Sequence, residues 1–153
     1  MSYANDMSTD VAKLVRTHAG LASSLAVSVS RLSRRLRKER HSDLSPTQLS
    51  ALGSLLRKGP LTLGALARSE NVQPPSMTRT VNCLEDMGMV VREPDADDRR
   101  QVLLRVSEPG LELLNAERKR RDAWLAQRLI ELEPQERAVL REAAVILERL
   151  AQR

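Results

Sequence analysis

The sequence predicts a mainly α-helical protein with one small β-hairpin, and three observations support this fold class. Apolar side chains recur at spacings of three and four residues over long stretches of the 153-residue chain. Near the middle, two short helical patterns are separated by only about three residues, as in a helix-turn-helix. Directly after them, two short apolar runs flank a polar loop, which is typical of a hairpin. The content of 41% hydrophobic and 29% charged residues suits a globular protein.

Composition also limits the classes of function. Aromatic residues make up 1% of the chain, so stacking platforms for single-stranded nucleic acid are excluded. The net charge of +5 favours a polyanionic partner. A single cysteine, Cys83, allows no internal disulfide and suits a reducing compartment. Because we find no apolar signal segment and no apolar run long enough to span a membrane, we expect a cytoplasmic protein without membrane contact.

The N-terminal part of the chain is expected to form a flexible tail, residues 1–8, followed by a long amphipathic helix. The helical pattern runs from Thr9 to Arg40, either unbroken or as two helices with a joint near Gly20. A helix of ~30 residues is about 45 Å long, and a chain of this size cannot bury so long a stripe in one globule. The stripe therefore packs on another helix of this chain or on a second subunit. The end of the helix is basic, which indicates a solvated face or a patch that contacts phosphate or a partner; the residues are Arg31, Arg34, Arg35, Arg37, Lys38, Arg40 and His41.

Cap residues predict two short helices after this segment. The first begins with a capping box and carries a proline at its first position. The second is short and ends at a residue that favours left-handed backbone. The first helix is indicated by Ser45, Pro46 and Gln48 at its start and by Gly59 and Pro60 at its end. The second helix is indicated by Thr62 at its start and by Asn71 after its end at Glu70.

The helix that follows, from Pro74 to a stop at Gly88, has one apolar side and one polar side. Met77, Val81, Leu84 and Gly88 share the apolar side, whereas Pro75, Arg79, Asn82 and Asp86 lie opposite, flanked by Ser76 and Thr78. A helix with short polar groups and one arginine suits the DNA major groove, as the second helix of a helix-turn-helix does. Taken alone, the pattern fits any surface helix.

A β-hairpin is predicted directly after this helix. Residues 89–93 and 101–106 are apolar, β-branched runs, and the polar loop 94–100 lies between them. A hairpin in this place is a wing, so the chain is predicted to contain a winged helix-turn-helix. Two more helices follow, one capped by Ser107 with Pro109 in its first turn, and one that begins at Pro134.

With these elements in order, the chain resembles the MarR family of winged helix-turn-helix transcription regulators over about residues 9–151. The family's wing motif, Asp-x-Arg before a hydrophobic strand and a Ser/Thr-Glu-x-Gly helix start, is matched by Asp98 and Arg100 and then by Ser107, Glu108 and Gly110. The other matching segments are residues 44–48, 63–67, 76–81, 84–90 and 98–104.

The resemblance implies a homodimer with a winged helix-turn-helix in residues 43–107. Residues 9–42 and 108–153 would be dimerisation helices, interlocked with those of the partner. The resemblance further implies a repressor that binds a palindromic operator in double-stranded DNA and leaves it when a small phenolic or aromatic carboxylate binds. A nonspecific, architectural DNA-binding protein is the alternative.

The same resemblance assigns candidate DNA contacts. In the recognition helix, Arg79 suits a guanine edge or a phosphate, and Pro75 offers apolar surface to thymine methyl groups. Gln73 caps poorly, so its side chain is expected to point to DNA or to leave the helix uncapped. The complete set is Gln73, Pro75, Ser76, Thr78, Arg79 and Asn82 in the helix, with Asp98, Arg99 and Arg100 in the wing.

In the wing, Arg99 and Arg100 are expected to enter the minor groove. Asp98 is expected to hold the loop or its arginine by an ion pair, whereas Asp95 and Asp97 are expected to form a solvated turn. The three acids would repel DNA unless they turn inward or pair with these arginines.

Other chemistry is not expected. Cys83 is interpreted as a small, half-buried filler, and it is too far in sequence from the two histidines to predict a zinc site. Trp124 is expected to pack between helices, with an effector cleft as the second interpretation. The sequence has no nucleophile–base pair and no phosphate-binding glycine loop, so neither an enzyme nor a cofactor is predicted.

Overall fold

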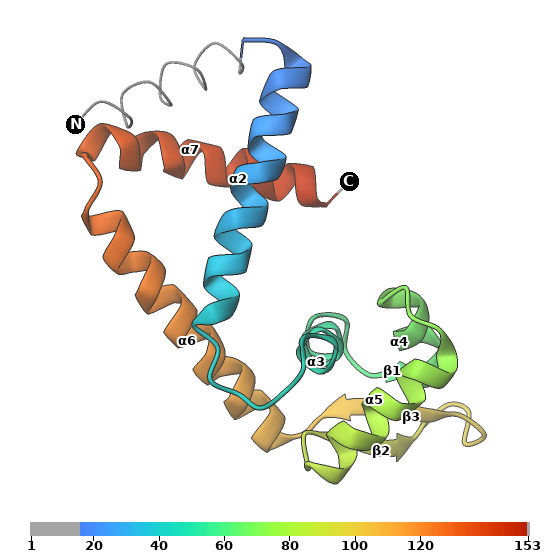
Figure 1. The fold of residues 1–153 in the computed structure, drawn as a ribbon. Coiled ribbons are helices and arrows are strands. Elements are labelled where there is room, and N and C mark those ends of the chain that lie inside the picture. Colours follow the sequence, from blue (N-terminus) through green and yellow to red (C-terminus); the bar gives the residue numbers. More distant parts are fainter. Residues whose placement is uncertain (1–15, 153) are drawn as a thin grey trace. The chain divides into compact units, whose positions relative to one another are not determined.

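The computed structural model describes residues 16–152 and separates into two compact units. The central unit runs from His41 to Asp122, and the helical unit combines the described residues up to Arg40 with those from Ala123 onward. The elements are α2 (His18–Lys38), α3 (Pro46–Lys58), β1 (Leu61–Thr62), α4 (Leu63–Ser69), α5 (Pro74–Asp86), β2 (Val90–Pro94), β3 (Val102–Val106), α6 (Glu108–Ile130) and α7 (Pro134–Ala151) (Figure 1). The predicted fold class, mainly helical with a small sheet, is confirmed.

The central unit packs three helices on one face of an antiparallel sheet with strand order β1-β3-β2. Seven side chains form its fully buried centre, all less than 2% exposed: Leu52, Leu66, Met77, Val81, Leu84, Val90 and Leu104. The first turns of α6 add Leu111, Leu113 and Leu114 to this core, so the compact unit extends past residue 107. The core carries the apolar side of α5 and therefore turns its polar side outward.

The predicted helix boundaries of the central unit are confirmed by their caps. The Ser45 N–H donates to Gln48 Oε1 at 2.6 Å and the Gln48 N–H donates to Ser45 Oγ at 3.2 Å, which completes the capping box. Thr62 Oγ1 accepts from the Ala65 N–H at 3.2 Å. Asn71 has the left-handed φ of 53° that ends the turn after α4.

A third strand, β1, was not predicted. Leu61 and Thr62 pair with Leu104 and Leu103 of β3. Two residues are too few to show the alternation by which a strand is recognised in a sequence. The pairing closes the edge of β3 and fixes the start of α4 against the hairpin.

Side-chain hydrogen bonds also join α3 to α4. The Ser50 hydroxyl donates to Glu70 Oε2 at 2.5 Å, and the buried Ser54 hydroxyl donates to Glu70 Oε1. The carboxylate therefore binds one helix to the end of the next.

The helical unit differs from expectation at the start of α2. Thr17 is extended, with φ −106° and ψ 153°, and its Oγ1 accepts from the Gly20 N–H at 3.0 Å. A helix that runs unbroken from Thr9 through Gly20 is therefore wrong, whereas the start of α2 at Thr17 lies close to the alternative joint near Gly20, which sits in the first turn. A β-branched residue that caps with its own hydroxyl explains the break. The predicted tail and residues 9–15 lie outside the described residues.

Apolar side chains on α2 and α7 are largely exposed. Neither helix has a buried residue within the chain. The exposed large ones are Leu21, Leu25, Val27, Val29 and Leu32 on α2 and Val139, Leu140, Val145, Ile146, Leu147 and Leu150 on α7. In the part of the chain that the structure describes, no helix has the length and apolar character needed to cross a membrane.

Candidate nucleic-acid interface

The start of α5 has an unusual hydrogen-bond pattern. Gln73 is the N-cap residue and makes no side-chain cap hydrogen bond. Pro74 and Pro75 have no N–H, so two of the four donors that a helix start leaves unsatisfied do not exist. The N–H groups of Ser76 and Met77 both donate to the Gln73 carbonyl at 3.0 Å. The helix therefore begins without a side-chain cap at little cost, and the Gln73 side chain stays exposed.

The two threonines of α5 use their hydroxyl hydrogens inside the helix. Thr78 Oγ1 donates to the Pro74 carbonyl at 2.9 Å, and Thr80 Oγ1 donates to the Ser76 carbonyl at 3.1 Å. Thr78 is half-buried, whereas Ser76 is exposed. Toward a ligand, the Thr78 side chain therefore offers its hydroxyl oxygen as an acceptor and its methyl group as an apolar contact.

Arg79 is exposed and makes no hydrogen bond or ion pair with any residue of the described range 16–152. All five guanidinium donors are therefore available to a partner. Asn82, one turn further on, is engaged: its Oδ1 accepts from Arg92 Nη2 at 2.7 Å. Arg92 was not predicted as a site residue, although its place two residues after the buried Val90 puts both on one face of β2.

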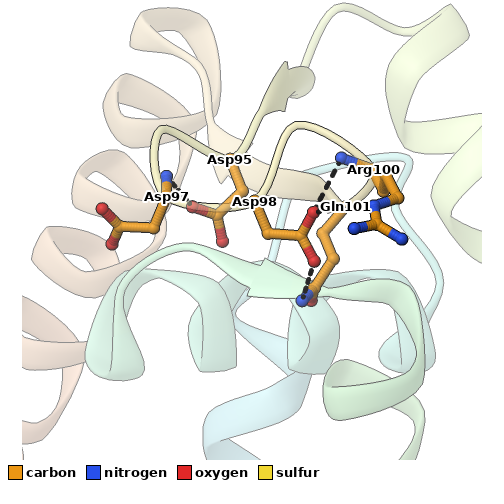
Figure 2. Close-up of polar contacts among 5 residues, drawn as sticks. All are labelled: Asp95, Asp97, Asp98, Arg100 and Gln101. Atoms are coloured by element: carbon orange, nitrogen blue, oxygen red, sulfur yellow. Dashed lines mark hydrogen bonds and ion pairs between the residues drawn. The ribbon is translucent and has the colours of Figure 1, made fainter.

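The wing loop is organised by two of its acids (Figure 2). Asp98 Oδ1 accepts from the Arg100 N–H at 3.1 Å, and its Oδ2 accepts from Gln101 Nε2 at 3.2 Å. The Arg100 guanidinium lies 3.7 Å from Asp98 Oδ1 through Nε. The predicted holding role of Asp98 is confirmed by these contacts. The Arg100 side chain as a whole is 96% exposed.

Asp95 does not form a purely solvated turn but is turned inward, which is one of the two alternatives expected for the acids. Its Oδ1 accepts from the Asp97 N–H at 2.9 Å, and its own N–H donates to the Gln101 carbonyl at 3.0 Å (Figure 2). Asp95 is thus part of the loop's framework, because an aspartate that binds the N–H two residues on closes a turn. Asp97 is exposed, as expected, and so is Arg99.

The root of the wing is bound to the end of α5. The Ser107 hydroxyl donates to the Gly88 carbonyl at 2.5 Å and accepts from the Gly110 N–H at 3.1 Å. The Ser107 N–H donates to the Met89 carbonyl at 3.0 Å. Gly88 has φ +72°, a backbone conformation that favours glycine. Hydrogen bonds therefore join the end of α5, the root of the wing and the start of α6.

The interpretation of Cys83 as a half-buried filler is wrong. Its side chain is exposed, and Gln48 Nε2 donates to its Sγ at 3.0 Å. The residue lies between the apolar and polar sides of α5, where spacing alone does not decide burial. Within residues 16–152, no three His, Cys, Asp or Glu side chains are placed to hold a metal ion.

Trp124, in the helical unit, is half-buried and contacts cations. The guanidinium carbon of Arg35 lies 5.0 Å from the centre of its ring, and that of Arg128 lies 5.5 Å away. Arg35 also pairs with Glu39 at 2.9 Å. The basic end of α2 is therefore partly used within the protein, through a cation–π contact.

Comparison with known proteins gives the family. Residues 44–102 match the model of the MarR family. Over 135 residues, the chain is 50% identical to an uncharacterized HTH-type transcriptional regulator of Mycobacterium bovis, and the match covers 88% of this chain and 94% of that protein. The chain belongs to the MarR family. A regulator of Mycobacterium leprae is 49% identical over the same length and coverage.

Solved structures of MarR proteins show the same fold. A MarR family protein of Bacillus stearothermophilus matches with a TM-score of 0.77 at 27% identity, covering 90% of this chain and 97% of that one. A mutant MepR of S. aureus, solved with a bound oligodeoxyribonucleotide, matches with a TM-score of 0.65 at 18% identity, covering 86% and 96%. This MarR chain is a transcriptional regulator with a DNA-binding fold, and its relatives are regulators, not enzymes.

Proposed function

We propose that this protein is a homodimeric repressor that reads a palindromic operator. One observation carries the proposal: the exposed polar side of α5, with an unpaired Arg79, adjoins a wing whose tip carries Arg99 and Arg100. A helix for the major groove and an arginine loop for the minor groove are the two parts that such a reader requires. The oligonucleotide bound to the S. aureus MepR mutant supports DNA as the partner.

Within the proposal, residues 43–107 bind DNA. Arg79 contacts a guanine edge or a phosphate, and Ser76 and Asn82 contact base edges or phosphates. Thr78 accepts through its oxygen, Gln73 reaches the backbone, and Pro75 contacts a thymine methyl group. In the wing, Asp98 holds the loop, and Arg99 and Arg100 enter the minor groove. Two of the acids, Asp95 and Asp98, accept hydrogen bonds inside the loop, whereas the Asp97 carboxylate is exposed.

The dimer is supported by the exposed apolar faces of α2 and α7. On α7, Val145 is 73% exposed and Val139 is 65% exposed in the single chain. So many large apolar groups on two helices indicate a subunit interface. In this proposal, residues 9–42 and 108–153 supply the interface. A two-fold dimer places its recognition helices about 34–36 Å apart, which matches palindromic half-sites one helical turn apart.

The proposed effector is a small aromatic or phenolic acid that weakens operator binding. Support comes from the basic end of α2, where Arg35 lies beside the Trp124 ring, since guanidinium groups and an aromatic face attract an aromatic carboxylate. The residues that would bind it are not assigned. Addition of a panel of aromatic acids to the protein–operator complex should identify a compound that raises the operator Kd, and a full panel without effect contradicts ligand release.

The test begins with selection of an operator from a randomised duplex library. The protein should bind the selected site at least ~10³-fold more tightly than random DNA at physiological salt. Arg79→Ala should weaken operator binding by about 5- to 150-fold, because one bidentate base contact is lost. Arg141→Ala, an exposed arginine outside residues 43–107, is the control for charge and should leave the Kd unchanged when the dimer is intact.

Two results would decide against the proposal. Equal affinity for the selected site and for random DNA would support the architectural alternative. An unchanged operator Kd for Arg79→Ala, with the oligomeric state intact, would remove α5 as the reading element.

A further inference from the structure

One arginine of the wing joins β2 to the recognition helix. Arg92 Nε donates to Glu85 Oε2 at 2.8 Å, and Arg92 Nη2 donates to Asn82 Oδ1 at 2.7 Å. Asn82 and Glu85 are three residues apart and lie side by side on α5. A single guanidinium group thus spans two neighbouring side chains of the helix, with two different nitrogens.

The backbone directs Arg92 to this position. Successive side chains of a strand alternate between faces, so Arg92 shares the face of Val90, which is buried in the core. Its register partner on β3, Leu104, is buried on the same face. Arg92 therefore leaves the sheet on the side where α5 packs, and its side chain is only 35% exposed.

In the contact between Arg92 and Asn82, the arginine can only be the donor. A guanidinium group only donates, so the amide atom that faces Arg92 must be the oxygen of Asn82. A free asparagine amide can turn over and exchange its oxygen and nitrogen, because rotation about its terminal bond is broad and roughly two-fold. Arg92 removes this freedom, and Glu85 holds Arg92 in place through the ion pair.

The orientation of an amide decides what it reads. Its oxygen accepts from base donors and its nitrogen donates to base acceptors, and the four base pairs differ in the order of these groups in the major groove. We propose that Arg92 is a positioning residue that sets the base preference of Asn82, through its contact with Oδ1 and without touching a base. This inference rests on the proposed function of α5 as the reading helix.

The experiment measures base preference in the full-length protein. Affinities are determined for the selected operator and for a set in which each base pair of the half-site is replaced in turn. The variants are Asn82→Ala, Arg92→Ala and the double variant. Arg105→Ala is the matched control, because Arg105 lies on β3 and pairs with Glu93 at 3.1 Å, so the same charge is lost from the adjacent strand.

We expect Asn82→Ala to reduce discrimination at one base pair of the half-site by about tenfold, the scale of a single base contact. Arg92→Ala should reduce discrimination at the same base pair by a similar factor. The double variant should lose no more than either single variant, because the two residues act as one unit. Arg105→Ala should keep the wild-type preference at every position.

Other roles of Arg92 give different results, and each of them overturns the inference. A phosphate contact lowers affinity for all sequences and reduces the slope of log K against log salt by about one. A purely structural role lowers all affinities equally without a change in preference. An Asn82→Ala variant with wild-type preference removes Asn82 as a reader. If the wild-type protein itself shows no base preference, the proposed function fails first, so the two failures are distinguishable.

Discussion

At the scale of single residues, Gly110 has less room for a Cβ atom than Gly53, Gly59, Gly64 or Gly88. A Cβ atom built there would overlap the Met89 carbonyl oxygen and would lie 2.9 Å from Val106 Cγ1. The first of these neighbours is backbone, which cannot turn aside as a side chain does. The close approach exists because Ser107 binds both the end of α5 and the Gly110 N–H.

Gly110→Ala should therefore destabilise the central unit by about 1–3 kcal/mol, the usual cost of overpacking. Urea unfolding followed by circular dichroism measures the change. The control is Gly64→Ala in α4, where the nearest atom, Arg68 Nη1, lies 3.6 Å from the added Cβ. The control should be neutral or stabilising by up to about 1 kcal/mol, because alanine favours a helix. Equal stability of the two variants would mean that the backbone around Gly110 moves to admit the added methyl group at little cost.

Single residues also show how far sequence analysis reaches. The burial of Met77, Val81 and Leu84 was predictable, because periodicity alone determines which side of a helix faces a core. The contacts of Arg92 were not, because they join residues of a strand and a helix whose distance depends on tertiary packing. Cys83 was misjudged for a related reason: a position at the edge of an apolar side can be buried or exposed.

At the scale of elements, two aspartates of the wing, Asp98 and Asp97, differ in what their carboxylates contact. Asp98 accepts three contacts from Arg100 and Gln101 and so orders the loop. Asp97 contributes its N–H to the Asp95 carboxylate, while its own carboxylate is exposed. Both carry the same charge, so their replacement separates the effect of loop order from the effect of charge.

Asp98→Ala should weaken operator binding by about tenfold, because the loop must then be ordered when DNA binds. Asp97→Ala should leave the Kd unchanged or lower, since it removes a negative charge close to phosphates and keeps the backbone hydrogen bond. Fluorescence anisotropy with the selected operator measures both. If the two variants strengthen binding to the same extent, Asp98 acts only through its charge.

Elements with strong local signals were predictable from the sequence. The capping box of α3 and the Thr62 cap of α4 are set by neighbouring residues, and the structure confirms both. β1 was missed because its two residues have no pattern of their own, and its existence depends on β3, which lies about 40 residues further along the chain. The start of α2 was misplaced because Thr17 fits the helical pattern and yet caps through its hydroxyl.

At the scale of the whole molecule, the apolar faces of α2 and α7 are exposed in the single chain, which supports the proposed homodimer. In a single chain, a helix such as α7, without one buried residue, gains little from packing. The expected homodimer has twice the chain mass of 17.1 kDa. In the proposed complex, operator binding depends on the dimer, because two linked recognition helices bind the two half-sites together.

Val145→Glu should shift the protein toward the monomer in sedimentation analysis and weaken operator binding by about 10²-fold or more, because the gain from two linked sites is lost. Leu150→Glu, at a second exposed apolar position on α7, should act in the same direction. The control is Gln135→Glu, which adds the same charge to an exposed position of α7. Dimers of unchanged stability in both apolar variants would show that α7 is not at the interface.

The chain's single tryptophan, Trp124, lies in the helical unit with Arg35 and Arg128 over its ring. Its fluorescence therefore reports the unfolding of the unit that holds it, whereas circular dichroism records the helices of both units. For a variant such as Gly110→Ala, which loosens the central unit, the circular dichroism signal should change at lower urea than the tryptophan emission. The separation of the two curves then measures how independently the central unit and the helical unit of this regulator unfold.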